Sequence, residues 1–131
     1  MVVVNSKEEL EELIEQRIEE RGLNCDLNDI DVSRIDDMSH LFYWSNFNGD
    51  ISRWNVSNVR DMKYMFYRSE FTGDISQWDV SNVRDMSEMF SYSNFNGDIS
   101  RWNVSSVENM NYIFAYSKFN RDISNWYKRL R

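Results

Sequence analysis

The chain contains no proline, one cysteine and one histidine among its 131 residues. A single cysteine, Cys25, excludes an internal disulfide. With His40 as the only histidine, the sequence also excludes a Cys/His zinc cluster and gives no support to a His-based catalytic triad. The absence of proline indicates that nearly every backbone N–H is needed as a hydrogen-bond donor in ladders or turns.

Long apolar runs are also absent. No segment approaches the ~20 apolar residues needed to cross a bilayer, so we expect no membrane span. The N-terminus, MVVVNSKEEL, lacks a basic region and has only three consecutive valines, which is unlike a signal peptide. As written, the sequence has the features of a cytoplasmic protein, and a surface location would require a leader that has been removed.

Acidic residues outnumber basic ones, and the formal net charge is −7. Such a chain is not expected to bind nucleic acid. Hydrophobic residues make up 41% of the sequence and aromatic residues 15%, which is enough for a packed core. The length indicates one domain.

A period of 24 residues organises most of the chain. Tryptophans recur at Trp54, Trp78, Trp102 and Trp126, and they define the units 31–54, 55–78, 79–102 and 103–126. Eight columns are apolar in every unit, and all eight phenylalanines fall in two of these columns. One unit cannot bury so many apolar side chains alone, but stacked copies can.

Each unit contains two recognisable segments. The pattern DMxxMF places apolar residues at i, i+3 and i+4 after an Asp or Asn, which predicts a short helix. The pattern GDISxW has β-branched residues after a glycine turn, which predicts a short strand that pairs in parallel with the next coil. The expected fold class is therefore α/β: a right-handed leucine-rich-repeat-like solenoid of four 24-residue coils.

We expect residues 1–30 to form an N-terminal cap and a partial coil. Val2–Val4 is strand-like, Ser6 and Glu9 have the spacing of a capping box, and the helix that follows should end near Gly22. The four repeats occupy residues 31–126. Residues 127–131 form a C-terminal tail in which no capping helix is expected.

The repeat WDVSNVRDMSEMFSYSNFNGDIS, at residues 78–100, resembles the short repeat of the BspA-like leucine-rich-repeat surface protein family of bacteria. The opening SKEELEELIEQRIEERG also looks like the usual lead-in to such arrays, and the resemblance covers roughly residues 5–126. It implies a leucine-rich-repeat-like solenoid used in binding or adhesion, often at the cell surface. No catalytic residues carry over, so we expect a protein that is not an enzyme and has no cofactor.

One aspartate recurs in each coil at the GDIS turn. In register, these like charges would repel one another, so we expect each carboxylate to accept hydrogen bonds from backbone N–H groups of its turn. A row of calcium ions, with Asn48, Asn96 and Asn120 as further oxygen ligands, is the alternative. Thr72 interrupts that asparagine column, and we assign no metal site. The aspartate column consists of Asp26, Asp50, Asp74, Asp98 and Asp122.

None of the seven tyrosines lies in an apolar column, and six fall in three neighbouring columns of the expected helix. In a repeat of the resembling kind we would expect small residues there. The rings either shield the edge of the core or form a recognition surface, because Tyr, Trp and Arg dominate the energetics of protein interfaces. The candidate binding residues for a protein partner are His40, Tyr43, Trp44, Tyr64, Tyr67, Arg68, Tyr92, Tyr112 and Tyr116.

These features favour a protein-binding or adhesion module. The alternative is a structural element that forms homo-oligomers through an uncapped C-terminal end, since solenoids need caps. A third function, an acidic inhibitor that imitates nucleic acid, fits the net charge less well. Enzyme activity has no support, because no activated nucleophile or acid–base pair recurs beside a pocket.

Overall fold

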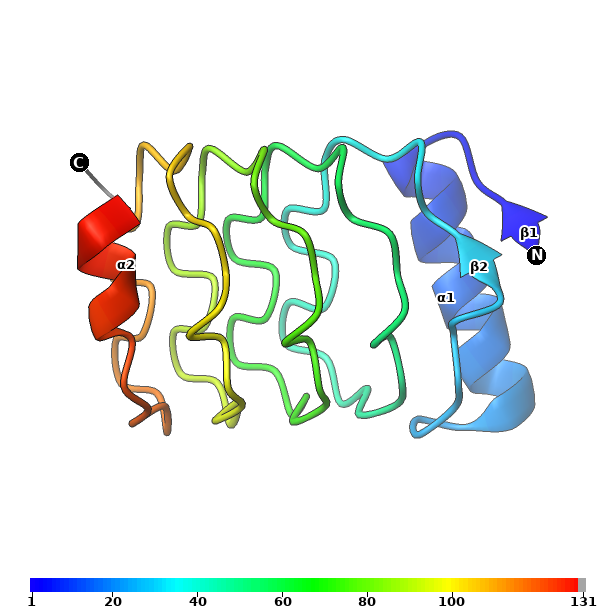
Figure 1. The fold of residues 1–131 in the computed structure, drawn as a ribbon. Coiled ribbons are helices and arrows are strands. Elements are labelled where there is room, and N and C mark those ends of the chain that lie inside the picture. Colours follow the sequence, from blue (N-terminus) through cyan, green and yellow to red (C-terminus); the bar gives the residue numbers. More distant parts are fainter. Residues whose placement is uncertain (130–131) are drawn as a thin grey trace.

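The computed structural model describes residues 1–129, with side chains as far as Trp126. The chain winds as a row of similar coils between two helices (Figure 1). Helix α1 (Lys7–Arg21) lies at the N-terminal end and helix α2 (Ser124–Arg129) at the C-terminal end. Strand β1 (Val2–Val3) pairs in parallel with strand β2 (Ile30–Asp31), with Val2 opposite Ile30.

Helix α1 has the boundaries that its sequence predicts. The Ser6 hydroxyl accepts a hydrogen bond from the Glu9 N–H at 3.1 Å, which caps the first turn. Gly22, at φ 93°, ends the helix and donates its N–H to the Ile18 carbonyl. Leu10 and Ile14 are buried, so the apolar face of α1 packs against the hydrophobic core at the N-terminal end.

Aromatic rings form continuous rows through the core. Phe42, Phe66, Phe90 and Phe114 stack with centroid separations of 5.5–5.7 Å, and each pair is 24 residues apart. A second phenylalanine row begins at Phe47 and has separations of 6.3–6.4 Å. The 24-residue period of the sequence is therefore a translation in space.

The four tryptophans of the repeat form a third row, with separations of 6.2–6.5 Å. Each indole N–H is buried and donates to a carbonyl of the preceding coil at 2.9–3.0 Å, as Trp78 does to Ile51. A buried indole N–H without a partner would cost about 1–3 kcal/mol. The pairing therefore allows tryptophan to serve as a core residue and also to link successive coils.

The prediction of a short helix in each unit is wrong. Residues 38–45 form three overlapping β-turns instead, in which the N–H groups of Leu41, Tyr43 and Ser45 donate to the carbonyls of Met38, His40 and Phe42. Alternate N–H groups of these turns donate to the next coil, as His40 does to Lys63, at 2.8–3.0 Å. The i, i+3, i+4 apolar pattern is satisfied by both conformations, and the bonds between coils stabilise the turns.

The strand predicted at GDISxW is also absent as a regular element. Within the described residues, the only regular strands are β1 and β2, and the coils contribute isolated parallel bridges such as Asp37–Asp61. At the C-terminal end, helix α2 forms where a tail without a capping helix was expected. Residues 130–131 of that tail lie outside the described residues. The assignment to a right-handed leucine-rich-repeat-like solenoid stays a prediction.

Arg121 stands at the turn position that Gly49, Gly73 and Gly97 occupy in earlier coils. A Cβ at Gly73 would lie 2.7 Å from the Phe71 ring, which is too close. In the last coil, the equivalent Phe119 ring is only partly buried and lies 4.1 Å from Phe114, against 4.7–4.9 Å for the earlier pairs. The ring's shift toward Phe114 leaves room for a side chain on residue 121.

The turn ladder formed by residues 38–45 and their equivalents in later coils has a direction. The Met38 N–H donates to the Asp61 carbonyl, and the N–H of the same peptide unit, on Met62, donates to the Asp85 carbonyl. The peptide groups of successive coils are thus hydrogen-bonded head to tail, as they are along an α-helix. Four such columns run side by side in this sense. At the two flanks, the bonds from Arg60 to Asp36 and from Glu70 to Ser45, with their equivalents, run the opposite way.

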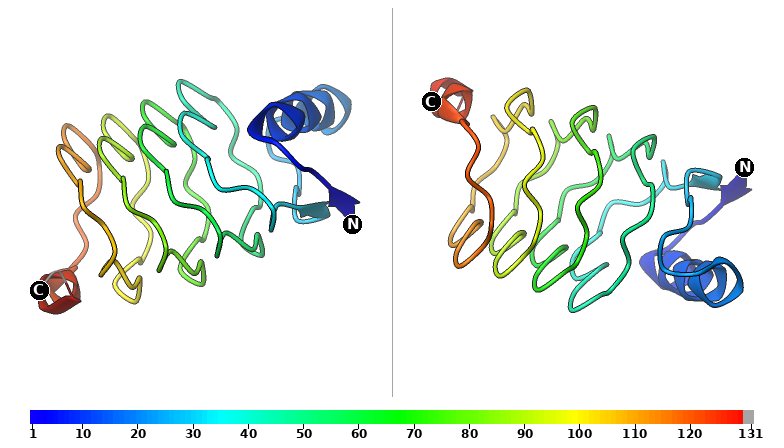
Figure 2. Two further views of the ribbon diagram at one scale, coloured as in Figure 1. Left: turned by 90° about the horizontal axis from the view of Figure 1, so that it is seen from above. Right: turned by 90° about the horizontal axis from the view of Figure 1, so that it is seen from below.

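Within the described residues, the ladder ends at the coil of residues 103–126. Four of its backbone N–H groups make no hydrogen bond to another described residue; they belong to Met110, Tyr112, Phe114 and Tyr116. Helix α1 lies beside the opposite, carbonyl end of the ladder, where Lys7 Nζ donates to Ser39 Oγ at 3.0 Å. Helix α2 follows a different edge of the last coil (Figure 2).

Candidate functional site

Eight described residues other than glycine have a positive φ, between 51° and 61°. They occupy two columns of the turn ladder, four residues apart within each coil. One column is His40, Tyr64, Glu88 and Tyr112, and the other is Trp44, Arg68, Tyr92 and Tyr116. In the first coil, His40 and Trp44 are the third residues of the turns at 38–41 and 42–45.

A left-handed backbone costs an L-residue about 1–2 kcal/mol, whereas glycine adopts it without this penalty. None of the eight positions holds glycine, although the fold would favour it there. Large aromatic or charged side chains stand at all of them. Backbone strain of this kind is a reason to consider a functional role for the side chains.

The first column is a mixed stack on the outer surface. The His40 and Tyr64 rings lie 4.9 Å apart and 15° from parallel, and the Tyr64 hydroxyl donates to Glu88 Oε2. This hydrogen bond to a carboxylate is the main cause that raises the pKa of Tyr64. Burial, together with the charges of Lys7 and Lys63, lowers the pKa of His40.

The second column contains a cation between two rings. Arg68 Cζ lies 4.6 Å from the Trp44 ring centre and 4.1 Å from that of Tyr92. Tyr92 stacks in turn on Tyr116 at 5.0 Å. Cation–π contacts of this geometry contribute about 0.5–2 kcal/mol each, so the column holds the arginine in one position.

A third column adds Tyr43 and Tyr67, whose rings stack at 5.2 Å. Tyr43 also contacts His40, and Tyr67 meets Tyr92 edge-on at 5.7 Å, so the three columns form one continuous surface. We call this surface the aromatic stripe. It consists of the nine predicted residues together with Glu88, which was not among them although it shares a 24-residue column with Tyr64 and Tyr112.

Several rings of the aromatic stripe are largely exposed to solvent. Exposed fractions reach 58% for Trp44, 74% for Tyr112 and 82% for Tyr116. Tyr64, Tyr67 and Arg68 are half-buried between coils. The half-buried rings, which cover the turn ladder, fit the interpretation that the stripe shields the edge of the core. The exposed rings, which extend from the ladder, fit the interpretation that it is a recognition surface.

The aspartate column lies on another side of the coils and is exposed to solvent. Each carboxylate accepts a hydrogen bond of 2.7–3.0 Å from the N–H two residues on, as Asp74 does from Ser76. Hydrogen bonds from Ser76 lower the pKa of Asp74 and outweigh the opposing charges of Asp50 and Asp98. The turn hydrogen bonds therefore offset the repulsion within the column.

The asparagines weighed as calcium ligands are engaged in bonds between coils. Asn48 Oδ1 accepts from the Thr72 N–H at 2.8 Å, and Asn96 Oδ1 accepts from the Asn120 N–H at 3.0 Å. Within residues 1–129, no group of three His, Cys, Asp or Glu side chains is arranged to hold a metal ion. The geometry of the described residues thus supplies turn capping at these positions and no preformed cation cage.

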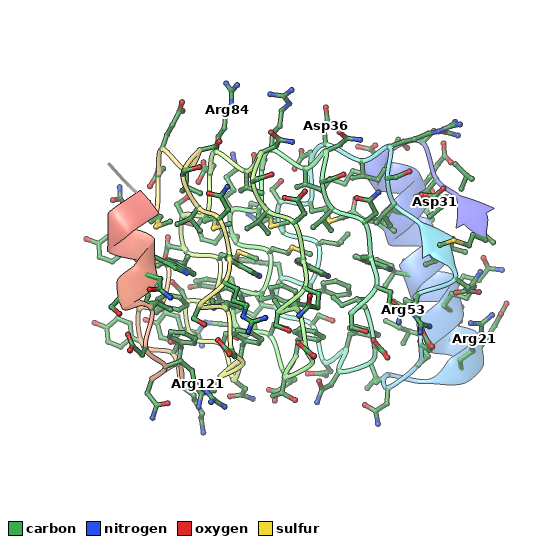
Figure 3. The ribbon with its side chains drawn as sticks, in the orientation of Figure 1. Arg21, Asp31, Asp36, Arg53, Arg84 and Arg121 are labelled. Atoms are coloured by element: carbon green, nitrogen blue, oxygen red, sulfur yellow. The ribbon has the colours of Figure 1, made fainter. Side chains whose placement is uncertain are left out.

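A surface hollow of about 450 Å³ lies beside this aspartate column, away from the stripe. Polar turn residues line it, and Arg121 reaches over it to donate to the Asn96 carbonyl at 3.0 Å. In Figure 3, Arg121 lies at one edge of the stack, whereas Asp36 and Arg84 project from the opposite edge. Neither described helix has the length and apolar character that crossing a bilayer requires.

Comparison with known proteins gives one match. The sequence profile of a family described as Mycoplasma protein of unknown function, DUF285, matches residues 9–126. No curated protein and no solved structure matches the chain. The matched segment includes most of α1 and all four repeats, and the chain belongs to the DUF285 family.

Proposed function

We propose that this chain is a non-enzymatic binding module that presents the aromatic stripe to a protein partner. In this proposal the coils form a right-handed leucine-rich-repeat-like solenoid, and their rigid stacking holds the stripe in place. The observation that carries the proposal is the set of eight large side chains at positive φ. A surface built only for stability would favour glycine at these positions.

The chemistry of the stripe supports a protein as the partner. Trp, Tyr and Arg are the residues whose removal most often weakens protein interfaces, and they make up most of this surface. Rings fixed by stacking also lose little side-chain entropy when a partner binds. The stripe extends along all four coils, so it suits an extended contact with a protein surface.

The resemblance to BspA-like repeats is the reason to include adhesion in the proposal. The DUF285 family is associated with BspA-like surface repeat proteins. The repeat WDVSNVRDMSEMFSYSNFNGDIS resembles the BspA-like repeat, and members of that family are used in binding or adhesion. Placing the stripe on a cell surface belongs to the same proposal.

The decisive experiment compares two variants with four alanine substitutions each. One removes Trp44, Tyr64, Arg68 and Tyr92 from the stripe. The matched control removes the exposed column of the opposite edge, which contains Asp36, Arg60, Arg84 and Glu108. Both are immobilised, and the proteins that they capture from cell-surface extracts are quantified by mass spectrometry.

We expect the stripe variant to lose the captured partner and the control variant to retain it. The stripe variant should unfold at a lower temperature than the wild type, because it loses the cation–π contacts of Arg68 and the stacking of Tyr64 and Tyr92. Capture is therefore compared at a temperature at which circular dichroism shows both variants to be folded. Equal capture by the two variants would mean that the stripe only covers the ladder.

A structural role in self-association is the second candidate. It is favoured by the last coil, where Met110, Ile113, Phe114 and Phe119 are only partly buried although most of their equivalents in inner coils are fully buried. Light scattering over a concentration series tests it, since association through this end should raise the mean mass. A constant monomer mass would eliminate this role.

A further inference from the structure

Arg68 is the one arginine of the described chain whose guanidinium lies between two aromatic rings. Trp44 belongs to the coil before it and Tyr92 to the coil after it, and the Tyr67 ring centre is 5.8 Å away. The side chain therefore has a fixed position on the exposed surface of the stripe.

No described residue neutralises this cation. Nε of Arg68 is buried and has no hydrogen-bond partner, and the terminal nitrogens form no hydrogen bond or ion pair with another described residue. An arginine presents five N–H donors, and a buried donor without a partner costs free energy. The terminal nitrogens are not buried, so the outer edge of the guanidinium faces solvent between Trp44 and Tyr92.

We propose that Arg68 is the charge-recognition residue of the stripe and binds the carboxylate of a glutamate or aspartate side chain in the partner protein. This inference rests on the proposed function of the stripe. The terminal nitrogens offer a planar fork that can donate two parallel hydrogen bonds to a carboxylate. The two rings keep the fork aligned before binding, which reduces the entropy cost of association.

The charges around Arg68 favour a carboxylate over a phosphate. A phosphorylated side chain carries a charge of about −1.5 to −2, and clusters of arginines are the usual sites that recognise it. Arg68 has no second free cation beside it on the stripe: Lys63 lies 3.6 Å from Asp61, and the Glu88 carboxylate shares the stripe through Tyr64. A single negative charge balances a single guanidinium.

A library of acetylated and amidated nonapeptides tests this assignment. The flanking positions are randomised, and the central residue is Glu, Gln or phosphoserine, so that the peptides differ only in the group offered to the guanidinium. Binding is measured for the wild type, Arg68→Gln, Arg68→Lys and the control Arg84→Gln. Arg84 is exposed at the opposite edge and has no ring contact of this kind (Figure 3).

We expect the wild type and Arg84→Gln to bind Glu-centred peptides about tenfold or more tightly than Gln-centred ones, as a charge-assisted hydrogen bond predicts. Arg68→Gln should lose this preference. Arg68→Lys should keep only part of it, because lysine retains the charge without the fork or the ring stacking. Thermal unfolding of each variant verifies that it is folded.

Three outcomes would overturn the inference. They are equal binding of Glu- and Gln-centred peptides, an Arg68-dependent preference for phosphoserine, and failure of the whole library to bind the wild type. In each case, the capture experiment with the stripe variant decides separately whether the stripe binds a protein. The carboxylate assignment can therefore fail while the proposed function stands.

Discussion

At the scale of single residues, the strained backbone of the turn ladder is the feature with the clearest energetic consequence. Tyr112 has φ 58°, is 74% exposed and stacks on no other ring among the described residues. Little packing is therefore lost when its ring is removed. The position isolates the cost of holding an L-residue in the left-handed region.

We predict that Tyr112→Gly is more stable than Tyr112→Ala by about 1 kcal/mol, because only glycine escapes the left-handed penalty. Chemical denaturation measures the difference. At Tyr43, whose φ is not positive, the order should reverse, since glycine there only adds flexibility to the unfolded chain. The same order at both sites would show that backbone strain does not govern the ladder.

His40 gives the molecule a pH dependence. Burial lowers its pKa below the ordinary value near 6.5, so the folded state binds a proton less readily than the unfolded state. Above pH ~6.5, His40 is neutral in both states and does not reduce the free energy of unfolding. As the pH falls from there toward the lowered folded-state pKa, protonation of the unfolded state reduces the free energy of unfolding.

We predict that an NMR titration of the single histidine gives a pKa below 6.5. Between pH 7.5 and 5, the wild type should also lose more stability than His40→Asn, because asparagine does not titrate and tolerates a positive φ. The comparison cancels the carboxylates that both proteins share. A pKa at or above the ordinary value would contradict this account.

At the scale of elements, the sequence predicts helix α1 and the buried columns well. The cap Ser6, the terminating Gly22 and the 24-residue apolar period act locally or repeat four times, so they leave strong patterns. The segment DMxxMF is misleading because its short apolar pattern fits a helix and a run of overlapping β-turns equally. A helix of two turns is only marginally stable in isolation, and bonds to adjacent coils decide the outcome.

The sequence indicates only part of the candidate site. The columns of tyrosines were visible because they avoid the apolar positions. The positive φ values and the position of Arg68 between Trp44 and Tyr92 were not visible, since both depend on contacts between coils. Nor did the sequence indicate that Arg17, on the inner face of α1, is paired.

Helix α1 carries this buried arginine toward the first coil. Arg17 is 7% exposed, and its Nη1 donates to both carboxylate oxygens of Asp29 at 2.6 and 2.7 Å. The hydrogen bonds from Arg17 are the main cause that lowers the pKa of Asp29. They join α1 to the segment that leads into β2.

We predict that Asp29→Ala destabilises the protein by about 1–3 kcal/mol, because it leaves a buried guanidinium without its acceptor. Asp36→Ala, at an exposed aspartate whose side chain makes no hydrogen bond to a described residue, is the control and should change little. Urea denaturation compares the two. A similar small effect of both substitutions would mean that Arg17 finds another partner.

At the scale of the whole molecule, the coils are interchangeable if the proposed solenoid is correct. Deleting residues 79–102 removes one period and brings the Met62 N–H opposite the Asn109 carbonyl, in the register that Asp85 now occupies. We predict that this protein folds cooperatively at a lower unfolding temperature, since one interface between coils is lost.

Deleting only residues 79–90 removes half a period and should abolish folding, because apolar columns would then face polar ones. Near-ultraviolet circular dichroism, which reports the packed tryptophans, distinguishes the two proteins. Loss of folding in both would indicate that the coils are not equivalent.

The N–H groups in the four columns of the turn ladder all point toward the C-terminal end, and this affects how two molecules could associate. Two molecules that met symmetrically through their final coils would press like poles together, with the N–H groups of Met110, Tyr112, Phe114 and Tyr116 facing the same groups of the partner. Such a contact would dehydrate donors without giving them acceptors, and each would oppose it by about 1–3 kcal/mol. The carbonyl groups at the N-terminal end of another copy's ladder cannot supply the missing acceptors, because helix α1 covers that end. The sign of these exposed groups therefore opposes a symmetric contact through the last described coil, whose partly buried apolar side chains favour association.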